Sequence, residues 1–123
     1  MNMKLELVPV PVSDVDKAID FYVNKVGFHL DIDSRVNESL RFVQLTPPGS
    51  ACSIVIGEGT TKMTPGSQKD LQMVVEDTQK AYETLKSKGI DATDVETLPW
   101  GIFTHFSDPD GNTWALQQMI KPA

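Results

Sequence analysis

The chain has 123 residues, of which 40% are hydrophobic and 23% are charged, a composition typical of one globular domain with a buried core. Its net charge of −6 opposes binding to nucleic-acid phosphates but is compatible with a cationic small molecule. The sequence has no apolar run of roughly 20 residues and no signal-peptide core, which predicts a protein without a membrane partner. Cys52 is its only cysteine, which fits a reducing compartment, so that we predict a cytoplasmic protein.

The first half of the chain predicts a strand, a helix and three more strands. Val8, Val10 and Val12 alternate as they would along a strand. Pro9 and Pro11 lie between them, and both lack an N–H group on the same side of the backbone. This strand is therefore predicted to face an edge or a loosely paired seam there. After the helix, three strand-like runs follow at residues 28–32, 40–46 and 51–57.

The second half repeats this pattern 63 residues further on. Asp14 and Asp77 each precede a helical pattern and are predicted to cap it. Gly27 and Gly89 are predicted to end these helices in the left-handed conformation, and they coincide only after a slip of one residue. Strands are predicted at 71–75, 91–96, 102–107 and 113–119. The last two are joined by the sequence Asp-Pro-Asp-Gly at 108–111, which suits a type I turn.

The predicted fold class is α+β, with two βαβββ modules that form curled mixed sheets around a shared cleft. Residues 1–123 are predicted to form a single domain. Module one covers about 1–57, a linker covers about 58–69, and module two covers about 70–123. The linker is identified by its turn-forming residues, Gly59, Pro65 and Gly66.

Two segments carry a resemblance to a known family: VSDVDKAIDFYVNKVGF at 12–28 and FSDPDGNTWALQQ at 106–118. In this order, within a duplicated βαβββ framework, they resemble the vicinal-oxygen-chelate superfamily. That superfamily includes glyoxalase I, extradiol dioxygenases, fosfomycin-resistance enzymes and bleomycin-binding proteins. The resemblance implies two modules around one cleft and a homodimer. It also implies that metal-using members place a His, Gln or Glu ligand on the first and last strands of each module.

The positions that match those metal ligands are mostly apolar in this sequence. They are Leu7, Val55, Asp70 and Ala115. Leucine, valine and alanine side chains have no lone pair to offer, whereas a catalytic zinc ion normally keeps three protein ligands. We therefore expect no metal cofactor, with a divalent metal held by other residues as the alternative.

If these positions face the cleft, strand alternation places further side chains along its walls. The candidate ligand-binding residues are Gln44, Asp70, Gln72, Trp100 and Gln117. Each has a plainer interpretation as well. Asp70 could be a solvated residue at the start of a strand, the glutamines could bond across strands, and Trp100 could cover the edge of the core.

The two histidines have different surroundings in the sequence. His105 is the candidate general base, because the unperturbed pKa of imidazole lies near neutrality, although a single histidine on a strand is more often structural. His29, Asp31 and Asp33 alternate along one strand and are predicted to face solvent together. They sit on one strand rather than converging from several, which is unlike a metal site.

Three functions are compatible with these observations. The first is a metal-free pocket that binds a small organic molecule, with a cationic one favoured by the acidic balance. The second is a metal-dependent lyase, isomerase or dioxygenase of the glyoxalase type, or an enzyme that uses His105 for acid–base chemistry. The third is an interaction module whose cleft is filled by its own side chains. The first requires the fewest assumptions and is the function that the sequence favours.

Overall fold

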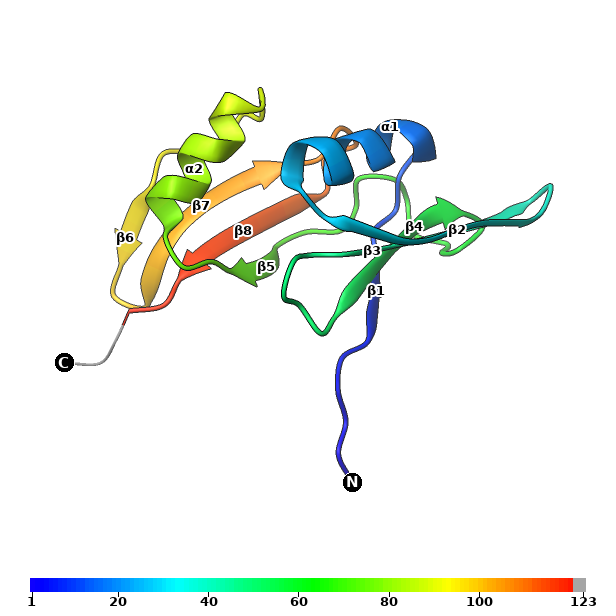
Figure 1. Ribbon diagram of the computed structural model, residues 1–123, viewed down its shortest axis with the longest axis horizontal. Helices are drawn as coiled ribbons and strands as arrows, with labels where there is room; N and C mark the ends of the chain where they lie inside the picture. The colour runs from blue at the N-terminus through cyan, green and yellow to red at the C-terminus, as the bar shows by residue number, and fades with distance from the viewer. Residues whose placement is uncertain (121–123) are drawn as a thin grey trace.

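The computed structural model describes residues 1–120 and contains two four-stranded mixed sheets (Figure 1). The first sheet has the strand order β1-β4-β3-β2 and the second has the order β5-β8-β7-β6. The strands are β1 (Leu7–Pro9), β2 (His29–Asn37), β3 (Leu40–Thr46), β4 (Ser53–Glu58), β5 (Leu71–Val74), β6 (Glu96–Leu98), β7 (Gly101–Ser107) and β8 (Thr113–Gln118). The helices are α1 (Val15–Ile19), which continues as the π-helix η1 (Asp20–Val26), and α2 (Thr78–Ser87).

This architecture confirms the predicted α+β class with two βαβββ modules. In each sheet the first strand pairs with the last strand in parallel, and the other pairs are antiparallel. In Figure 1 both helical segments lie above the sheets, and the N-terminus extends below them. None of the helices within residues 1–120 has the length and apolarity needed to cross a bilayer.

The internal repeat extends to the register of the strands. Pro9 pairs with Val55 in the first sheet, and Gln72 pairs with Ala115 in the second. Pro9 and Gln72 are 63 residues apart, which is the same offset that relates the two helix caps. Val55 and Ala115 therefore occupy equivalent positions in their sheets.

Strand β1 lies at an edge of the first sheet, as its prolines predicted. It pairs only with β4, and the N–H group of Val10 donates to the carbonyl oxygen of Val55 at 2.9 Å. The nitrogen atoms of Pro9 and Pro11 consequently face the free side, where no hydrogen bond is lost. The strand ends at Pro9, earlier than the alternation of valines suggested.

Both predicted helix caps are present. Asp14 accepts a hydrogen bond from the N–H group of Lys17, and Asp77 accepts one from that of Lys80, each at 3.1 Å. Each bond satisfies one of the free N–H groups of the first turn. At the other ends, Gly27 and Gly89 have φ angles of 100° and 79°, which a residue with a Cβ atom adopts only at a cost.

The one-residue slip in the repeat corresponds to the π-helix. Asp14 and Gly27 are 13 positions apart (27 − 14), whereas Asp77 and Gly89 are 12 apart (89 − 77). In η1 the N–H group of Gly27 bonds to the carbonyl oxygen of Tyr22, five residues earlier, at 2.9 Å. Bonds of this spacing accommodate an extra residue within a helix of the same length.

Strand β2 contains a register shift that the sequence did not reveal. Because of the shift between Leu30 and Ile32, Asp33 lies opposite the buried residue Val43, on the face that the helix covers. There Asp33 accepts two hydrogen bonds from Arg41, each at 3.0 Å, and these bonds lower the pKa of its carboxyl group. His29, Asp31 and Asp33 are all exposed, as predicted. Asp33 nevertheless does not share the face of the other two, because a bulge reverses the alternation beyond it.

Strand β6 is shorter than the predicted run at 91–96 and begins only at Glu96. Before Glu96, Thr93 binds β7 through one hydrogen bond of its backbone and one of its side chain. Its N–H group donates to the carbonyl oxygen of His105 at 2.8 Å, and its hydroxyl accepts from the N–H group of His105 at 2.9 Å. The side chain thus replaces a ladder bond, so the segment before Glu96 follows β7 without forming a regular strand.

A buried polar cluster joins the two modules. The hydroxyl of Tyr22 in η1 donates to Asp108 at 2.7 Å and accepts from the indole N–H of Trp114 at 2.9 Å. Asn112 donates to Asp108 at 2.7 Å and to the carbonyl oxygen of Pro11 at 2.8 Å. The turn that the sequence predicted between β7 and β8 is therefore attached to the helix and the first strand segment of the other module.

We expect Tyr22→Phe to lower the free energy of unfolding by about 1–3 kcal/mol, because it leaves the buried indole N–H of Trp114 without a partner and removes one of the hydrogen bonds that Asp108 accepts. Urea denaturation followed by circular dichroism measures the change. Tyr82→Phe is the matched control, since the Tyr82 hydroxyl lies 3.5 Å from Asp94 in an exposed contact, and we expect it to cost less than about 0.5 kcal/mol. Equal effects of the two variants would contradict a special role for the buried cluster.

Candidate functional site

Each sheet has one face covered by a helix and a second face turned away from it, which we call the open face. On the second sheet, Trp114 and Leu116 of β8 pack into the core beneath the helices. Alternation then places the intervening residues on the open face. Because Gln72 pairs with Ala115 and Phe103 pairs with Gln117, this open face carries Gln72, Phe103, His105, Ala115 and Gln117.

Three of the predicted ligand-binding residues are in contact there. The amide of Gln72 donates a hydrogen bond to the side-chain oxygen of Gln117. Gln117 in turn donates to the carbonyl oxygen of Trp100 at 2.9 Å. Gly101 permits this approach, since a Cβ atom there would lie 2.6 Å from the amide nitrogen of Gln117. The two amides therefore satisfy part of each other's hydrogen bonding, as the plainer interpretation required.

Aromatic side chains flank the amide pair. Trp100 lies in the turn between β6 and β7 and is 65% exposed. The rings of Phe103 and His105 stack with their centroids 6.2 Å apart and an angle of 14° between their planes. Phe103 was not selected from the sequence, although its position two residues before His105 places it on the same face. Phe103 is buried, with 6% of its surface exposed, whereas Trp100 and His105 are exposed. Aromatic rings beside amides suit a flat organic molecule better than they suit an ion.

His105 has no acidic partner to orient it. Within residues 1–120 its side chain makes no ion pair or hydrogen bond, and its backbone N–H group binds Thr93. A general base is normally held in place by a second polar group. The structure therefore offers His105 as an exposed ring on the open face, without the arrangement that acid–base catalysis requires.

Asp70 and Gln44 lie apart from this group. Asp70 precedes β5 with a φ angle of 60°, and its N–H group donates to the hydroxyl of Thr113 at 2.8 Å. Its side chain is exposed and makes no ion pair within residues 1–120. Gln44 lies on β3 of the other sheet, where its amide is 3.4 Å from the hydroxyl of Ser53.

The residues at the family's metal-ligand positions do not fit a divalent ion. Leu7 and Val55 lie on the first sheet, Ala115 lies on the second, and none of the three has a donor atom. Asp70 alone could contribute an oxygen. Within residues 1–120, no group of three or more His, Cys, Asp or Glu side chains is arranged to hold a metal ion.

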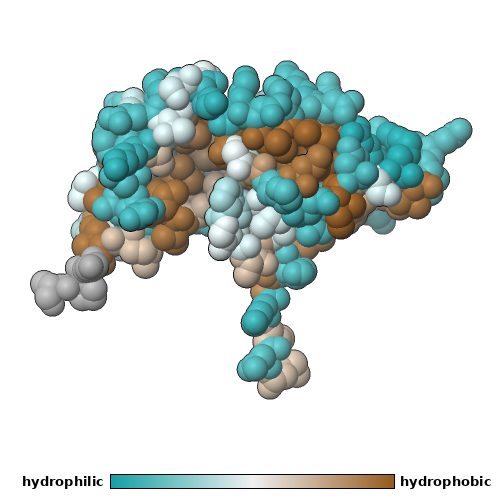
Figure 2. Space-filling model, viewed as in Figure 1, coloured by the Kyte–Doolittle hydropathy of each residue, from teal (hydrophilic) through white to brown (hydrophobic). Residues whose placement is uncertain are grey.

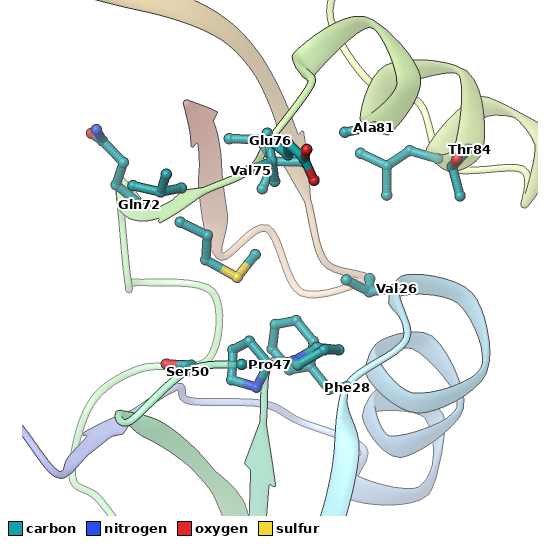
Figure 3. Close-up of a pocket in the computed structure, with 15 residues that line it drawn as sticks. Val26, Phe28, Pro47, Ser50, Gln72, Val75, Glu76, Ala81 and Thr84 are labelled. Atoms are coloured by element: carbon teal, nitrogen blue, oxygen red, sulfur yellow. The ribbon is translucent and has the colours of Figure 1, made fainter. Parts of the chain in front are cut away.

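A groove of about 660 Å³ lies between the modules on the helix side. Figure 2 shows this hollow with apolar residues around it, and Figure 3 shows its walls. Phe28 and Pro47 of the first module face Ala81 and Thr84 of α2, while the amide of Gln72 points away from the groove. The groove reaches the edge strand β5, where Gln72 also lines it, so that the groove and the open face lie on opposite sides of that strand and meet at it.

Two βαβββ modules, each with a parallel pair between its first and last strands, define a known architecture. A sequence profile of the glyoxalase/bleomycin resistance protein/dioxygenase superfamily matches residues 4–116. The chain belongs to this superfamily.

Individual relatives share both sequence and fold. TnmS3, an antibiotic binding protein from Streptomyces sp. CB03234, is 36% identical with a TM-score of 0.89, over 97% of this chain and 98% of its own. A superfamily member from Sphaerobacter thermophilus is 33% identical with a TM-score of 0.83, over 95% and 98% of the two chains. The uncharacterized protein YetH of Bacillus subtilis is 30% identical over 96% of this chain and all of its own.

We expect the purified protein to retain far less than one equivalent of divalent metal after incubation with Zn²⁺ or Mn²⁺ and desalting, because a stable site needs several donor atoms. Elemental analysis by mass spectrometry measures the content. Asp70→Asn is the control, because asparagine tolerates the left-handed conformation and removes the charge, and it is expected to leave the content unchanged. One tightly held ion per chain that disappears in Asp70→Asn would refute the expectation.

Proposed function

We propose that this protein binds a small organic molecule on the open faces of its sheets, without a metal ion, and that cations are favoured. The observation that carries the proposal is the pair of amides of Gln72 and Gln117 on one face with the stacked rings of Phe103 and His105. The exposed Trp100 lies next to them, because its carbonyl oxygen accepts from Gln117. Flat apolar surface with a few oriented polar groups is the usual composition of a small-molecule site. The net charge of −6 favours the approach of cations.

The relatives support binding rather than a particular reaction. TnmS3 is an antibiotic binding protein, and the similarity covers nearly the whole of both chains. The donor atoms that glyoxalase-type chemistry would need are replaced by Leu7, Val55 and Ala115. His105 has no partner within residues 1–120 that would orient it as a base. We therefore assign the open faces to binding.

The site is proposed to be completed by a second copy of the chain in a homodimer. Strands β1 and β5 are both edge strands. The unpaired backbone groups of β5 are able to pair with another chain, whereas the proline nitrogens on the free side of β1 limit pairing there. Large apolar side chains also remain exposed next to them, since Leu5 is 70% exposed and Val74 is 66% exposed. Pairing of such edges would bury this surface and place open faces from two chains around one cavity.

We expect metal-free bleomycin, used as a cationic aromatic probe, to raise the melting temperature of the protein and to quench the fluorescence of Trp100. Trp100→Ala should weaken binding about tenfold through loss of stacking, with little effect on stability because the side chain is exposed. Isothermal titration calorimetry in buffer containing a chelator measures the affinity.

A variant in the groove tests whether the probe binds there or on the open face. Ala81→Leu narrows the groove between the modules and is expected to leave the affinity for the probe unchanged. Loss of binding in Ala81→Leu but not in Trp100→Ala would move the site to the groove. A strict requirement for a divalent metal would contradict the proposed function.

A further inference from the structure

The open face of the first sheet carries a connected row of polar side chains. The hydroxyl of Thr46 donates to the carboxylate of Asp31, and the hydroxyls of Thr46 and Ser53 lie 2.6 Å apart. The amide of Gln44 then lies 3.4 Å from the hydroxyl of Ser53. This row crosses β2, β3 and β4 and ends in a single carboxylate.

The register of the strands shows that the row lies on the open face. Leu45 and Ile54 are paired and buried in the core under the helix, so that their neighbours point the other way. Ser53 pairs with Leu7 and Gln44 pairs with Val55. The polar row is therefore adjacent to the positions where metal-using members of the superfamily place ligands and where this chain has apolar residues.

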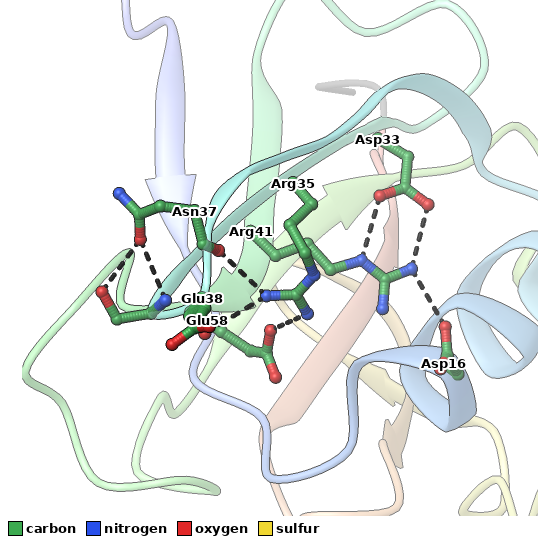
Figure 4. A network of polar contacts seen from close by, with 8 residues as sticks. Asp16, Asp33, Arg35, Asn37, Glu38, Arg41 and Glu58 are labelled. Carbon is green, nitrogen blue, oxygen red and sulfur yellow. Dashed lines mark hydrogen bonds and ion pairs between the residues drawn. The ribbon is translucent and has the colours of Figure 1, made fainter.

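Asp31 differs from the other ion-paired carboxylates of this sheet. Figure 4 shows that Arg41 binds both Asp33 and Asp16, and that Arg35 binds Glu58. Each of these acids has a permanently charged guanidinium as its partner.

Within residues 1–120 the ionic partner of Asp31 is His29, at 3.7 Å, and that imidazole is charged only when it is protonated. The side chain of Asp31 is nevertheless only 26% exposed. Asp31 lies on an exposed strand, so that its carboxylate is partly covered by protein and still reachable from solvent. A carboxylate in this position that lacks a permanent counterion is a favourable partner for an external cation.

We propose that Asp31 is the residue that selects cationic ligands, by binding a protonated amine or a guanidinium group of the molecule on the open faces. This inference rests on the proposed function and adds to it the chemical class of the ligand and the residue that recognises it. The hydroxyl oxygen of Thr46 lies beside the carboxylate and accepts a further hydrogen bond from the same cationic group, while the buried Ser53 holds the Thr46 hydroxyl in place. Leu7 and Val55 provide the apolar surface for the rest of the molecule.

A matched pair of probes tests this assignment. Proflavine and acridone are similar tricyclic molecules, of which proflavine is a cation at neutral pH and acridone is neutral. The wild-type protein is expected to bind proflavine several times more tightly than acridone. Asp31→Asn keeps the size of the side chain and its bond to Thr46. It is expected to weaken proflavine binding about tenfold, the effect of losing one charge-assisted contact, while acridone binding changes less than about twofold.

Asp33→Asn is the matched control, because it removes the same charge from the same strand on the opposite face of the sheet. It should leave the affinity for both probes unchanged, and Asp31→Glu should restore part of the preference for proflavine. Circular dichroism and the urea midpoint confirm that each variant is folded. Equal losses in Asp31→Asn and Asp33→Asn would indicate a general charge effect and overturn the assignment.

The remaining outcomes separate this inference from the proposed function. If the wild-type protein binds both probes equally and Asp31→Asn changes neither affinity, the open faces bind small molecules but Asp31 does not select cations. If the wild-type protein binds neither probe, nor metal-free bleomycin, the proposed function fails and the role of Asp31 fails with it.

Discussion

The hydrogen bonds of Asp108 are the interaction on which the arrangement of the two modules depends. This carboxylate is 5% exposed and accepts from the hydroxyl of Tyr22, from the amide of Asn112, and from the N–H groups of Asp110 and Asn112. Burial, followed by the charge of Asp108, raises the pKa of Tyr22, so that the phenol remains a donor. A satisfied buried network of this kind fixes a unique packing. It therefore fixes how the two open faces lie relative to each other.

Features that depend on local chemistry could be predicted from the sequence. Asp14 and Asp77 cap their helices because a short side-chain acceptor before a helix binds the free N–H groups of its first turn, wherever the helix lies. The face occupied by Asp33 could not be predicted, because the bulge in β2 depends on its pairing with β3. The helical pattern identified Tyr22 as a packing residue, but its bond to Asp108, 86 residues later, is set by the packing of one module on the other.

In the candidate site too, some features could be predicted from the sequence and others depend on how the strands pair. Gln72 and Gln117 were found because the repeat and the alternation of strands place them on one side. Trp100 was found as a tryptophan on a loop between Pro99 and Gly101, where it could close over a ligand. The sequence could not show that the two amides bond to each other, since this depends on the parallel pairing of β5 and β8. Asp31 was assigned to a solvent face, and its partial burial beside Thr46 follows from strand pairing in the first sheet. The groove between the modules likewise arises from tertiary packing alone.

The two modules share one fold but present different chemistry on equivalent surfaces. Val55 and Ala115 occupy the same register position in the two sheets, and both are small and apolar where an ion would require donor atoms. Around Val55 the first sheet offers hydroxyls and a carboxylate, whereas around Ala115 the second offers amides and aromatic rings. A ligand that used both surfaces would need a flat apolar body and a positively charged group. Under the proposed function, these surfaces would hold an organic cation by stacking and charge, at positions where the chain has apolar side chains instead of donor atoms.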